Sequence, residues 1–467
     1  RIPGVGGYFS SSDLLPRDVN PYSNERYMIY INTAAVPPGD NGFDSVIAHE
    51  FAHAVSALNN YNPATWVNEG SAELSSHLAG FSPGSARPFL ATPETQLNAW
   101  ARSGAAVGAH YGGALLFLKY LYQRFGGFES IPDLLDNPGR GTFAVDQFLR
   151  ERHGTTFDAV FDDWLVANLV DSPADRRFAY PDDEIKVAVD RALGPGGQSS
   201  VSFETPPYTG RYVRLREPGR IGSLRIEGDD RTRALANQAH SGRLQWWSNR
   251  GDLMQSTLTR AFDLTGVSAA QLDFWVWHDI ERNWDFAYLM ASVDEGRTWQ
   301  LLQAPTMSRE NPVGNNLGIG WTGISGGGRT PAWVRESVDL SAYAGRRIHL
   351  RFAYVTDEGF EAPGFALDDL SLPQIGFADD MESGSGWEAR GFVALLNELP
   401  TRLTARLVQT APRLEVIDVP IGAAGVGQIR PSDHLPDAQE LYLVVAGHAP
   451  ATTVSSPLTL TVQTRDN

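Results

Sequence analysis

The residues best suited to chemistry stand in the run His49-Glu50-Phe51-Ala52-His53. Apolar residues at three-to-four spacing from Phe43 to Leu58 predict a helix across this run. Histidines four residues apart lie on one face of such a helix, so both imidazoles can bind one zinc ion. Glu50 would then stand beside the open coordination position, where a carboxylate can act as a general base.

A catalytic zinc site takes three protein ligands and leaves the fourth position to water, so another donor is needed. The segment from Trp66 to Glu73 predicts a second helix one loop later, and we expect Glu69 on it to be the third ligand. Glu73, one turn further on, and Asn68 are expected to hold the ligands in place by hydrogen bonds. The reverse assignment, with Glu73 as the ligand and Glu69 in support, stays open at this point.

Composition limits both the metal chemistry and the partners. The chain of 467 residues has no cysteine, so a transition metal must be bound by nitrogen and oxygen. Its net charge of −17 disfavours nucleic acid as a partner. No run of 18 apolar residues predicts a membrane span. The sequence begins at Arg1 without an initiator Met or an apolar leader, which indicates a form whose targeting segment is missing.

Three regions differ in their patterns and predict a multidomain chain, α+β first and then all-β. Residues 1–195 combine helical periodicity with a short strand and form the expected catalytic domain. Tryptophan-rich β runs after a glycine-rich hinge predict a jelly-roll sandwich at 199–386. Shorter β runs predict a small C-terminal sandwich at 388–467.

The two helical motifs, H-E-F-A-H and W-V-N-E-G-S-A-E, resemble those of the gluzincins, a clan of zinc peptidases. Within the clan the chain is similar to bacterial secreted neutral metallopeptidases of the hyicolysin and immune inhibitor A-like kinds. This resemblance implies zinc, Glu69 as third ligand, protein or peptide substrates and an extracellular location. It also implies that Tyr111, in a Tyr-x-x-Gly segment, stabilises the oxyanion; His110 is the alternative, since thermolysin-like enzymes use a His.

Two other functions remain open on the sequence. Gluzincin aminopeptidases bind the substrate amine through a Glu in a G-x-M-E-N segment, whereas Glu25 is the only Glu before Glu50 here. The resemblance therefore favours an endopeptidase over an aminopeptidase, with the Arg26–Thr33 strand as a candidate edge for an extended peptide. The other alternative is a glycan-binding or protein-binding β-sandwich protein whose metal site is inert.

The β region carries its own candidates. Segments around Asp279–Phe286, Ser292–Trp299 and Phe365–Leu370 are similar to the MAM-like jelly roll that follows the catalytic domain in immune inhibitor A-type peptidases. That resemblance implies a structural Ca²⁺ site, for which carboxylates at strand ends are suitable ligands. The candidate ligands are Glu281, Asp285 and Asp369, and the candidates for glycan or cell-surface contact are Trp246, Trp247, Trp275 and Trp277.

Overall fold

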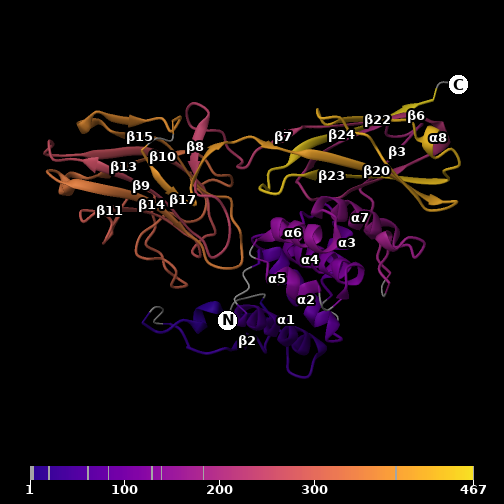
Figure 1. Cartoon of the computed structure of the whole chain (residues 1–467), viewed down its shortest axis with the longest axis horizontal. Coiled ribbons are helices and arrows are strands. Elements are labelled where there is room, and N and C mark those ends of the chain that lie inside the picture. Colours follow the sequence, from indigo (N-terminus) through magenta and orange to yellow (C-terminus); the bar gives the residue numbers. More distant parts are fainter. Residues whose placement is uncertain are drawn as a thin grey trace. The chain divides into compact units, whose positions relative to one another are not determined.

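The computed structural model describes residues 5–18, 22–59, 63–81, 84–127, 130–137, 139–181, 184–383 and 386–465. The chain divides into two units (Figure 1). One contains residues 1–232, 400–450 and 455–467, and the other contains residues 233–399 and 451–454. Within the described residues, no helix has the length and apolar character needed to cross a membrane.

The first unit begins with a helical layer that carries the histidine motif. Asp40 is the N-cap residue of its first helix: the Asp40 carboxylate accepts a hydrogen bond from the Gly42 amide and so satisfies one free N–H of the first turn. A core of apolar side chains, among them Trp66, Phe117 and Trp164, joins the helices. The helices are α1 (Asn41–Leu58), α2 (Thr65–Leu78), α3 (Ala86–Ala91), α4 (Ala105–Arg124), α5 (Ser130–Leu135), α6 (Gly141–His153) and α7 (Phe157–Val170).

A small sheet lies against α1. Strands β1 (Gly7–Phe9) and β2 (Ile29–Ile31) pair antiparallel, with Tyr8 opposite Tyr30. The rings of these two tyrosines stack at 4.4 Å. An added Cβ on Gly7 would meet Val46 of α1 at 2.7 Å, so glycine at this position lets the strand approach the helix closely.

The first unit also contains a β-sandwich made from two distant parts of the chain. One sheet has the order β21-β20-β23-β5-β3 and the other β22-β6-β24-β4, and their apolar faces share one core. The strands before the second unit are β3 (Arg191–Leu193), β4 (Ser200–Thr205), β5 (Arg211–Leu215), β6 (Ile221–Gly228) and β7 (Arg231–Thr232). Those after it are β19 (Leu399–Pro400), β20 (Arg402–Ala411), β21 (Glu415–Asp418), β22 (Val426–Ile429), β23 (Glu440–His448) and β24 (Ser456–Thr464), with a short helix α8 (Pro431–His434).

Helix α7 joins the helical layer to this sandwich. Val408 of β20 and Val444 of β23 belong to the same apolar core as the helices. Beside that core, Asp163 of α7 forms ion pairs with Arg406 of β20 at 2.7 Å and with Arg124 of α4 at 2.9 Å. The helical layer and the sandwich are therefore packed as one body.

The second unit is a separate sandwich of two antiparallel sheets. One has the order β13-β10-β15-β8-β18, with β16 also paired to β15, and the other has the order β12-β11-β14-β9-β17. Apolar residues of both sheets fill its core, including Phe274 and Phe352. The strands are β8 (Leu244–Trp247), β9 (Gln255–Asp263), β10 (Gln271–Asp279), β11 (Phe286–Ser292), β12 (Gln300–Leu302), β13 (Val334–Asp339), β14 (Arg347–Val355), β15 (Gly364–Leu372), β16 (Phe377–Asp379), β17 (Glu388–Arg390) and β18 (Val393–Leu396).

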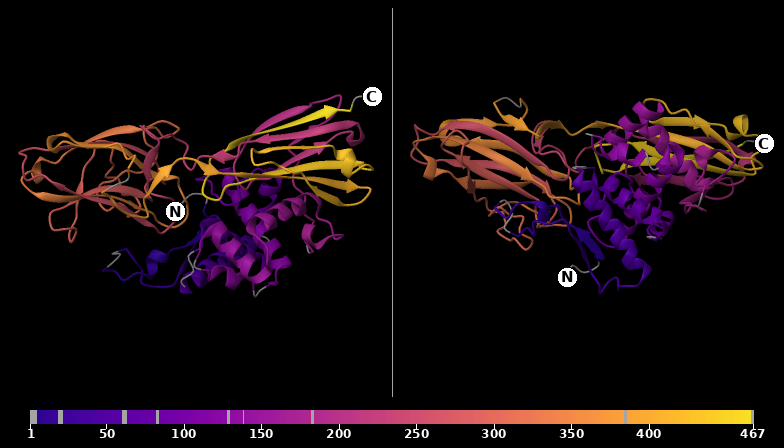
Figure 2. Two further views of the ribbon diagram at one scale, coloured as in Figure 1. Left: turned by 45° about the horizontal axis from the view of Figure 1, so that its top comes forward. Right: turned by 60° about the horizontal axis from the view of Figure 1, so that its bottom comes forward.

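The strand pairing corrects the expected domain boundaries. Strands β4, β5 and β6, expected in a jelly roll at 199–386, pair instead with the C-terminal strands; Figure 2 shows the two groups side by side, in magenta and yellow. Strands β17 and β18, expected in a C-terminal sandwich at 388–467, pair with β9 and β8 of the second unit. Periodicity predicts that a segment is a strand, but the partner of that strand depends on long-range contacts that periodicity does not contain.

Candidate metal centre

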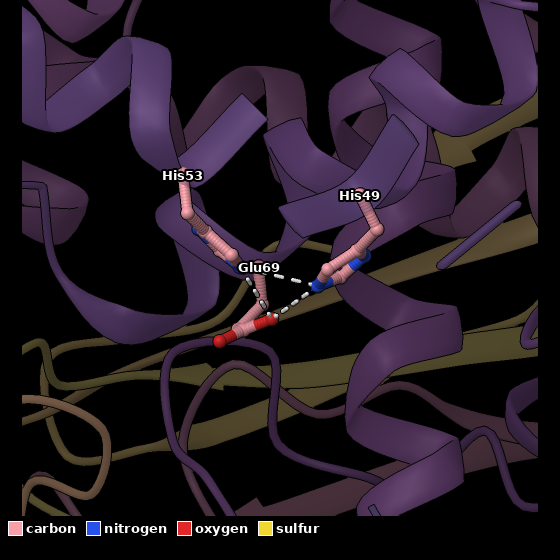
Figure 3. A group of neighbouring side chains, drawn as sticks. All are labelled: His49, His53 and Glu69. Carbon is pink, nitrogen blue, oxygen red and sulfur yellow. Dashed lines mark hydrogen bonds and ion pairs between the residues drawn. The ribbon is translucent and has the colours of Figure 1, made fainter. Parts of the chain in front are cut away.

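Helices α1 and α2 bring the predicted ligands together. His49 and His53 lie one turn apart on α1, and their rings face the carboxylate of Glu69 on α2 (Figure 3). One ligand atom from each of the three lies within 4.8 Å of the others. The separations are 3.1 Å from His49 Nε2 to Glu69 Oε2, 3.5 Å from His53 Nε2 to the same oxygen, and 3.1 Å between the two Nε2 atoms.

These separations fit a zinc ion. Ligands at about 2.0–2.1 Å from a tetrahedral ion lie about 3.3 Å from one another. Two imidazole nitrogens and one carboxylate oxygen are also the donor set of a catalytic rather than a structural zinc site, because the fourth position stays open to water. The chain's own donors therefore satisfy both the distance and the chemistry that zinc requires.

The remaining nitrogen of each imidazole is bound by α2. His49 Nδ1 lies 3.0 Å from Glu73 Oε1, and His53 Nδ1 lies 3.2 Å from Asn68 Oδ1. A hydrogen bond at Nδ1 orients the ring and directs the Nε2 lone pair towards a metal. The structure thus brings Asn68 and Glu73 to the positions expected for supporting residues. Because Glu73 contacts the opposite side of the His49 ring from Nε2, the geometry favours Glu69 over Glu73 as the ligand.

The charges of the cluster stabilise one another. Burial opposes the charged form of His49, but hydrogen bonds to Glu69 and Glu73 outweigh it and raise the pKa of His49 to about 10. Burial likewise opposes ionisation of Glu69, but the charge of His53 and the hydrogen bonds from both imidazoles hold the pKa of Glu69 well below its usual range. A divalent cation bound here would replace the proton that His49 shares with Glu69.

Glu50 lies beside the ligands and points to the small sheet. It is 6% exposed, and burial raises the pKa of its carboxyl above the usual value. The backbone N–H of Phe9, in β1, is close enough to oppose this rise of the pKa in part. A buried carboxylate with a raised pKa is better suited to accept and return a proton near neutral pH than an exposed one.

The structure separates the two candidates for the oxyanion donor. The Tyr111 ring lies 5.9 Å from that of His49, and its hydroxyl is close enough to Glu69, Glu73 and Glu50 for their charges to act on its pKa. Burial raises the pKa of this hydroxyl well above its usual value, so it remains a donor. His110 faces the backbone of the preceding loop at Gln96 and Ala99 instead; the Trp100 ring lies near both candidates, 5.6 Å from that of His110 and 4.9 Å from that of Tyr111. Burial lowers the pKa of His110 to about 4.

In the second unit, the candidate Ca²⁺ ligands need one correction. Glu281, Asp285 and Asp357 offer carboxylate oxygens within 4.8 Å of one another. Asp369 is not part of this group: it binds His240 Nδ1 at 2.5 Å and the Ser241 hydroxyl at 2.6 Å. The pairing of β11 with β14 explains why Asp357 belongs to this group.

Phe286 stands opposite Val355 in that pairing, so the chain just before β11 lies beside the chain just after β14, which contains Asp357. The signal that could have found Asp357 is this antiparallel pairing of two predicted strands. Burial raises the pKa of Asp285 to about 9 and the pKa of Asp357 to about 7. Three of the four tryptophans considered for glycan contact, Trp246, Trp247 and Trp277, are buried.

Comparison with known proteins defines the class of the second unit. Residues 229–395 match the family model described as Immune inhibitor A-like, MAM domain. The expected resemblance to this type of β domain is therefore confirmed, with boundaries that agree with the second unit more closely than with 199–386.

Part of the chain is also related to curated bacterial proteins. It is 30% identical over 183 residues to "Immune inhibitor A" of Bacillus thuringiensis subsp. alesti, covering 38% of this chain and 25% of that protein. It is 30% identical over 154 residues to "Pre-pro-metalloprotease PrtV" of Vibrio cholerae serotype O1 (strain M66-2), covering 32% and 16%. It is 28% identical over 101 residues to "Bacillopeptidase F" of Bacillus subtilis (strain 168), covering 22% and 6%. The matches span a quarter or less of each relative's length.

Proposed function

We propose that the chain is a secreted zinc endopeptidase that hydrolyses peptide bonds in proteins, with Glu50 as its general base. The observation that carries this proposal is the convergence of His49, His53 and Glu69 within 4.8 Å, next to a buried glutamate. A metalloprotease among the partial relatives supports the same reaction class. Secretion and protein substrates are inferred from the resemblance to immune inhibitor A-type peptidases.

In this proposal, His49, His53 and Glu69 hold the ion, and Asn68 and Glu73 orient the two imidazoles. Zinc, when bound, supplies a Lewis acid that activates water and polarises the scissile carbonyl. Glu50 accepts a proton from the attacking water and returns it to the departing amine. The Tyr111 hydroxyl donates a hydrogen bond to the oxygen on which negative charge develops.

The substrate backbone is proposed to lie along the small sheet. The backbone N–H of Phe9, in β1, is close enough to Glu50 to act on the pKa of its carboxyl, so β1 is the strand of this sheet that we place next to the general base. An extended peptide that adds to a strand edge next to the base brings a peptide bond close to it. This differs from the sequence expectation, which assigned the edge to Arg26–Thr33. Glu25 accepts a hydrogen bond from the Arg17 amide in a local loop, which leaves the endopeptidase favoured over the aminopeptidase.

We also propose that Glu281, Asp285 and Asp357 hold a structural Ca²⁺ ion in the MAM domain. Three oxygen donors at the ends of neighbouring strands match the preference of this hard cation. The ion would offset the mutual repulsion of these carboxylates, two of which, Asp285 and Asp357, have pKa values raised by burial.

The test of the peptidase is digestion of casein by the zinc-loaded chain, followed by mass-spectrometric mapping of the cleaved bonds. We expect internal cleavage that a chelator abolishes and added zinc restores. Peptides with a free and an acetylated amine should be cut alike. Loss of cleavage on acetylation would point to an aminopeptidase, and zinc binding without any cleavage would refute the peptidase.

A further inference from the structure

Glu73, which binds His49 from behind, has a second partner that the sequence did not single out. Its Oε1 lies 3.0 Å from His49 Nδ1, while its Oε2 accepts a hydrogen bond from the hydroxyl of Ser85. Glu73 is 8% exposed. A carboxylate with one anchor can turn about its terminal bond, whereas anchors on both oxygens fix its plane and therefore the direction in which it receives the imidazole N–H.

The hydroxyl of Ser85 is directed to Glu73 rather than to its own helix. Ser85 stands at the N-cap of α3, where a serine side chain commonly accepts a hydrogen bond from a backbone N–H of the first turn. No such cap bond forms here. The side chain is thus turned away from the usual local role of a serine at this position and towards the metal centre.

Helix α4 fixes the place of Ser85. A Cβ added to Gly112 would lie 2.1 Å from the Ser85 carbonyl oxygen and 2.9 Å from the Phe89 Cβ. Only a glycine lets α4 approach the Ser85 backbone this closely. Gly112 directly follows Tyr111, whose ring lies 5.9 Å from that of His49. Neighbouring residues of α4 therefore lie beside the ligand His49 and set the position of the residue that holds Glu73.

We propose that Ser85 is a positioning residue of the metal centre, acting through Glu73 to orient the imidazole ring of His49. The proposal rests on the proposed zinc site. It adds Ser85, at the N-cap of α3, to the residues that orient the ligands: Ser85 contacts Glu73 of α2, which contacts His49 of α1. Its effect should appear in the zinc affinity itself, because a ligand whose orientation is lost binds the metal less tightly.

The experiment measures the zinc dissociation constant by competition with a chromophoric chelator for the wild type, Ser85→Ala, Ser85→Thr and Ser75→Ala. Ser75 is the matched control: it is an exposed serine on α2 whose hydroxyl donates to the Ser71 carbonyl at 2.8 Å. We expect Ser85→Ala to weaken zinc binding about tenfold. Ser85→Thr, which keeps the hydroxyl, should restore the affinity, and Ser75→Ala should leave it unchanged.

A double-mutant cycle tests the route through Glu73. If Ser85 acts through Glu73, Ser85→Ala has no further effect on zinc affinity in a Glu73→Ala background. In the zinc-loaded protein, the Nδ1–H proton resonance of His49 should also shift upfield in Ser85→Ala, because its hydrogen bond to Glu73 weakens, and should recover in Ser85→Thr, which a general loss of stability would not produce.

Wild-type zinc affinity in Ser85→Ala, or an undiminished effect of that change in the Glu73→Ala background, would overturn the role of Ser85 and leave the zinc site standing. Failure of the wild type to bind zinc would overturn both the site and this inference. The two failures are therefore distinguishable.

Discussion

The two units each gather three candidate ligands, but they do so with different chemistry. The helical cluster mixes two imidazoles with one carboxylate, and its hydrogen bonds lower the pKa of Glu69 while raising that of His49. The cluster in the MAM domain consists of the carboxylates Glu281, Asp285 and Asp357, and burial raises the pKa of Asp285 to about 9.

The comparison separates two ways of preparing a metal site. Imidazoles and a carboxylate attract one another and so keep the ligating geometry in the absence of a metal. Neighbouring carboxylates repel one another and are stable together only when protons or a cation neutralise them. We therefore expect loss of metal from the helical site to lower peptide hydrolysis, and loss of metal from the carboxylate site to lower the free energy of unfolding.

The largest expected effect is a loss of turnover, and bound zinc distinguishes a change of the general base from a change of a metal ligand. Glu50→Gln should retain zinc and lower kcat about 10²–10⁴-fold, because the amide cannot accept the proton of the attacking water. Glu69→Ala should release zinc as well as abolish cleavage. Elemental analysis and casein hydrolysis measure the two effects, with Glu151→Gln on α6 as an exposed control. Normal turnover by Glu50→Gln would remove Glu50 from the mechanism.

A smaller effect is expected at the oxyanion donor. Tyr111→Phe removes only the hydroxyl and should lower kcat about 10²–10³-fold with little change in KM or in bound zinc. His110→Ala serves as the comparison, since its ring contacts Trp100 and the loop before α4. If His110→Ala lost the larger share of kcat, the oxyanion donor would have to be reassigned.

The smallest effect concerns the stability of the MAM domain and depends on pH. Asp285 and Asp357 have raised folded-state pKa values, about 9 and about 7, so between about pH 4 and pH 9 the folded state binds more protons than the unfolded state. Without Ca²⁺, the free energy of unfolding should therefore fall as the pH rises through this range.

Added Ca²⁺ should oppose that fall. At about 100 times its Kd the ion contributes about 2.7 kcal/mol, or roughly 5–10 °C in Tm for a domain of this size. Calorimetry at pH 5 and pH 8 checks the prediction, with Asp285→Asn expected to remove the calcium response and Asp369→Asn to keep it. A calcium response that survives Asp285→Asn but disappears in Asp369→Asn would restore the ligand set expected from the sequence.

The difference between the helical cluster and the carboxylate cluster also explains which site residues the sequence could predict. His49, Glu50, His53 and Glu69 lie on two consecutive helices, and helical spacing places residues on a face without knowledge of the rest of the fold. Asp357 belongs to the second cluster because of the register between β11 and β14, which are far apart in sequence, whereas Asp369 of β15 binds His240 and Ser241 instead. The pairing of β4 to β6 with the C-terminal strands is equally non-local. Ser85 was missed because its contact depends on the close approach of α4 at Gly112.

The sandwich that packs against α7 has a consequence for how the protein is made. Helices α1 to α7 are translated before residues 233–399 of the second unit, but β20 and β23, which share the core of these helices, are translated after them. Until β20 has been translated, Asp163 of α7 cannot form its ion pair with Arg406. Domains generally fold in the order of their translation. Here the core that the helices share with β20 and β23 can be completed only after the residues between α7 and β20 have been translated.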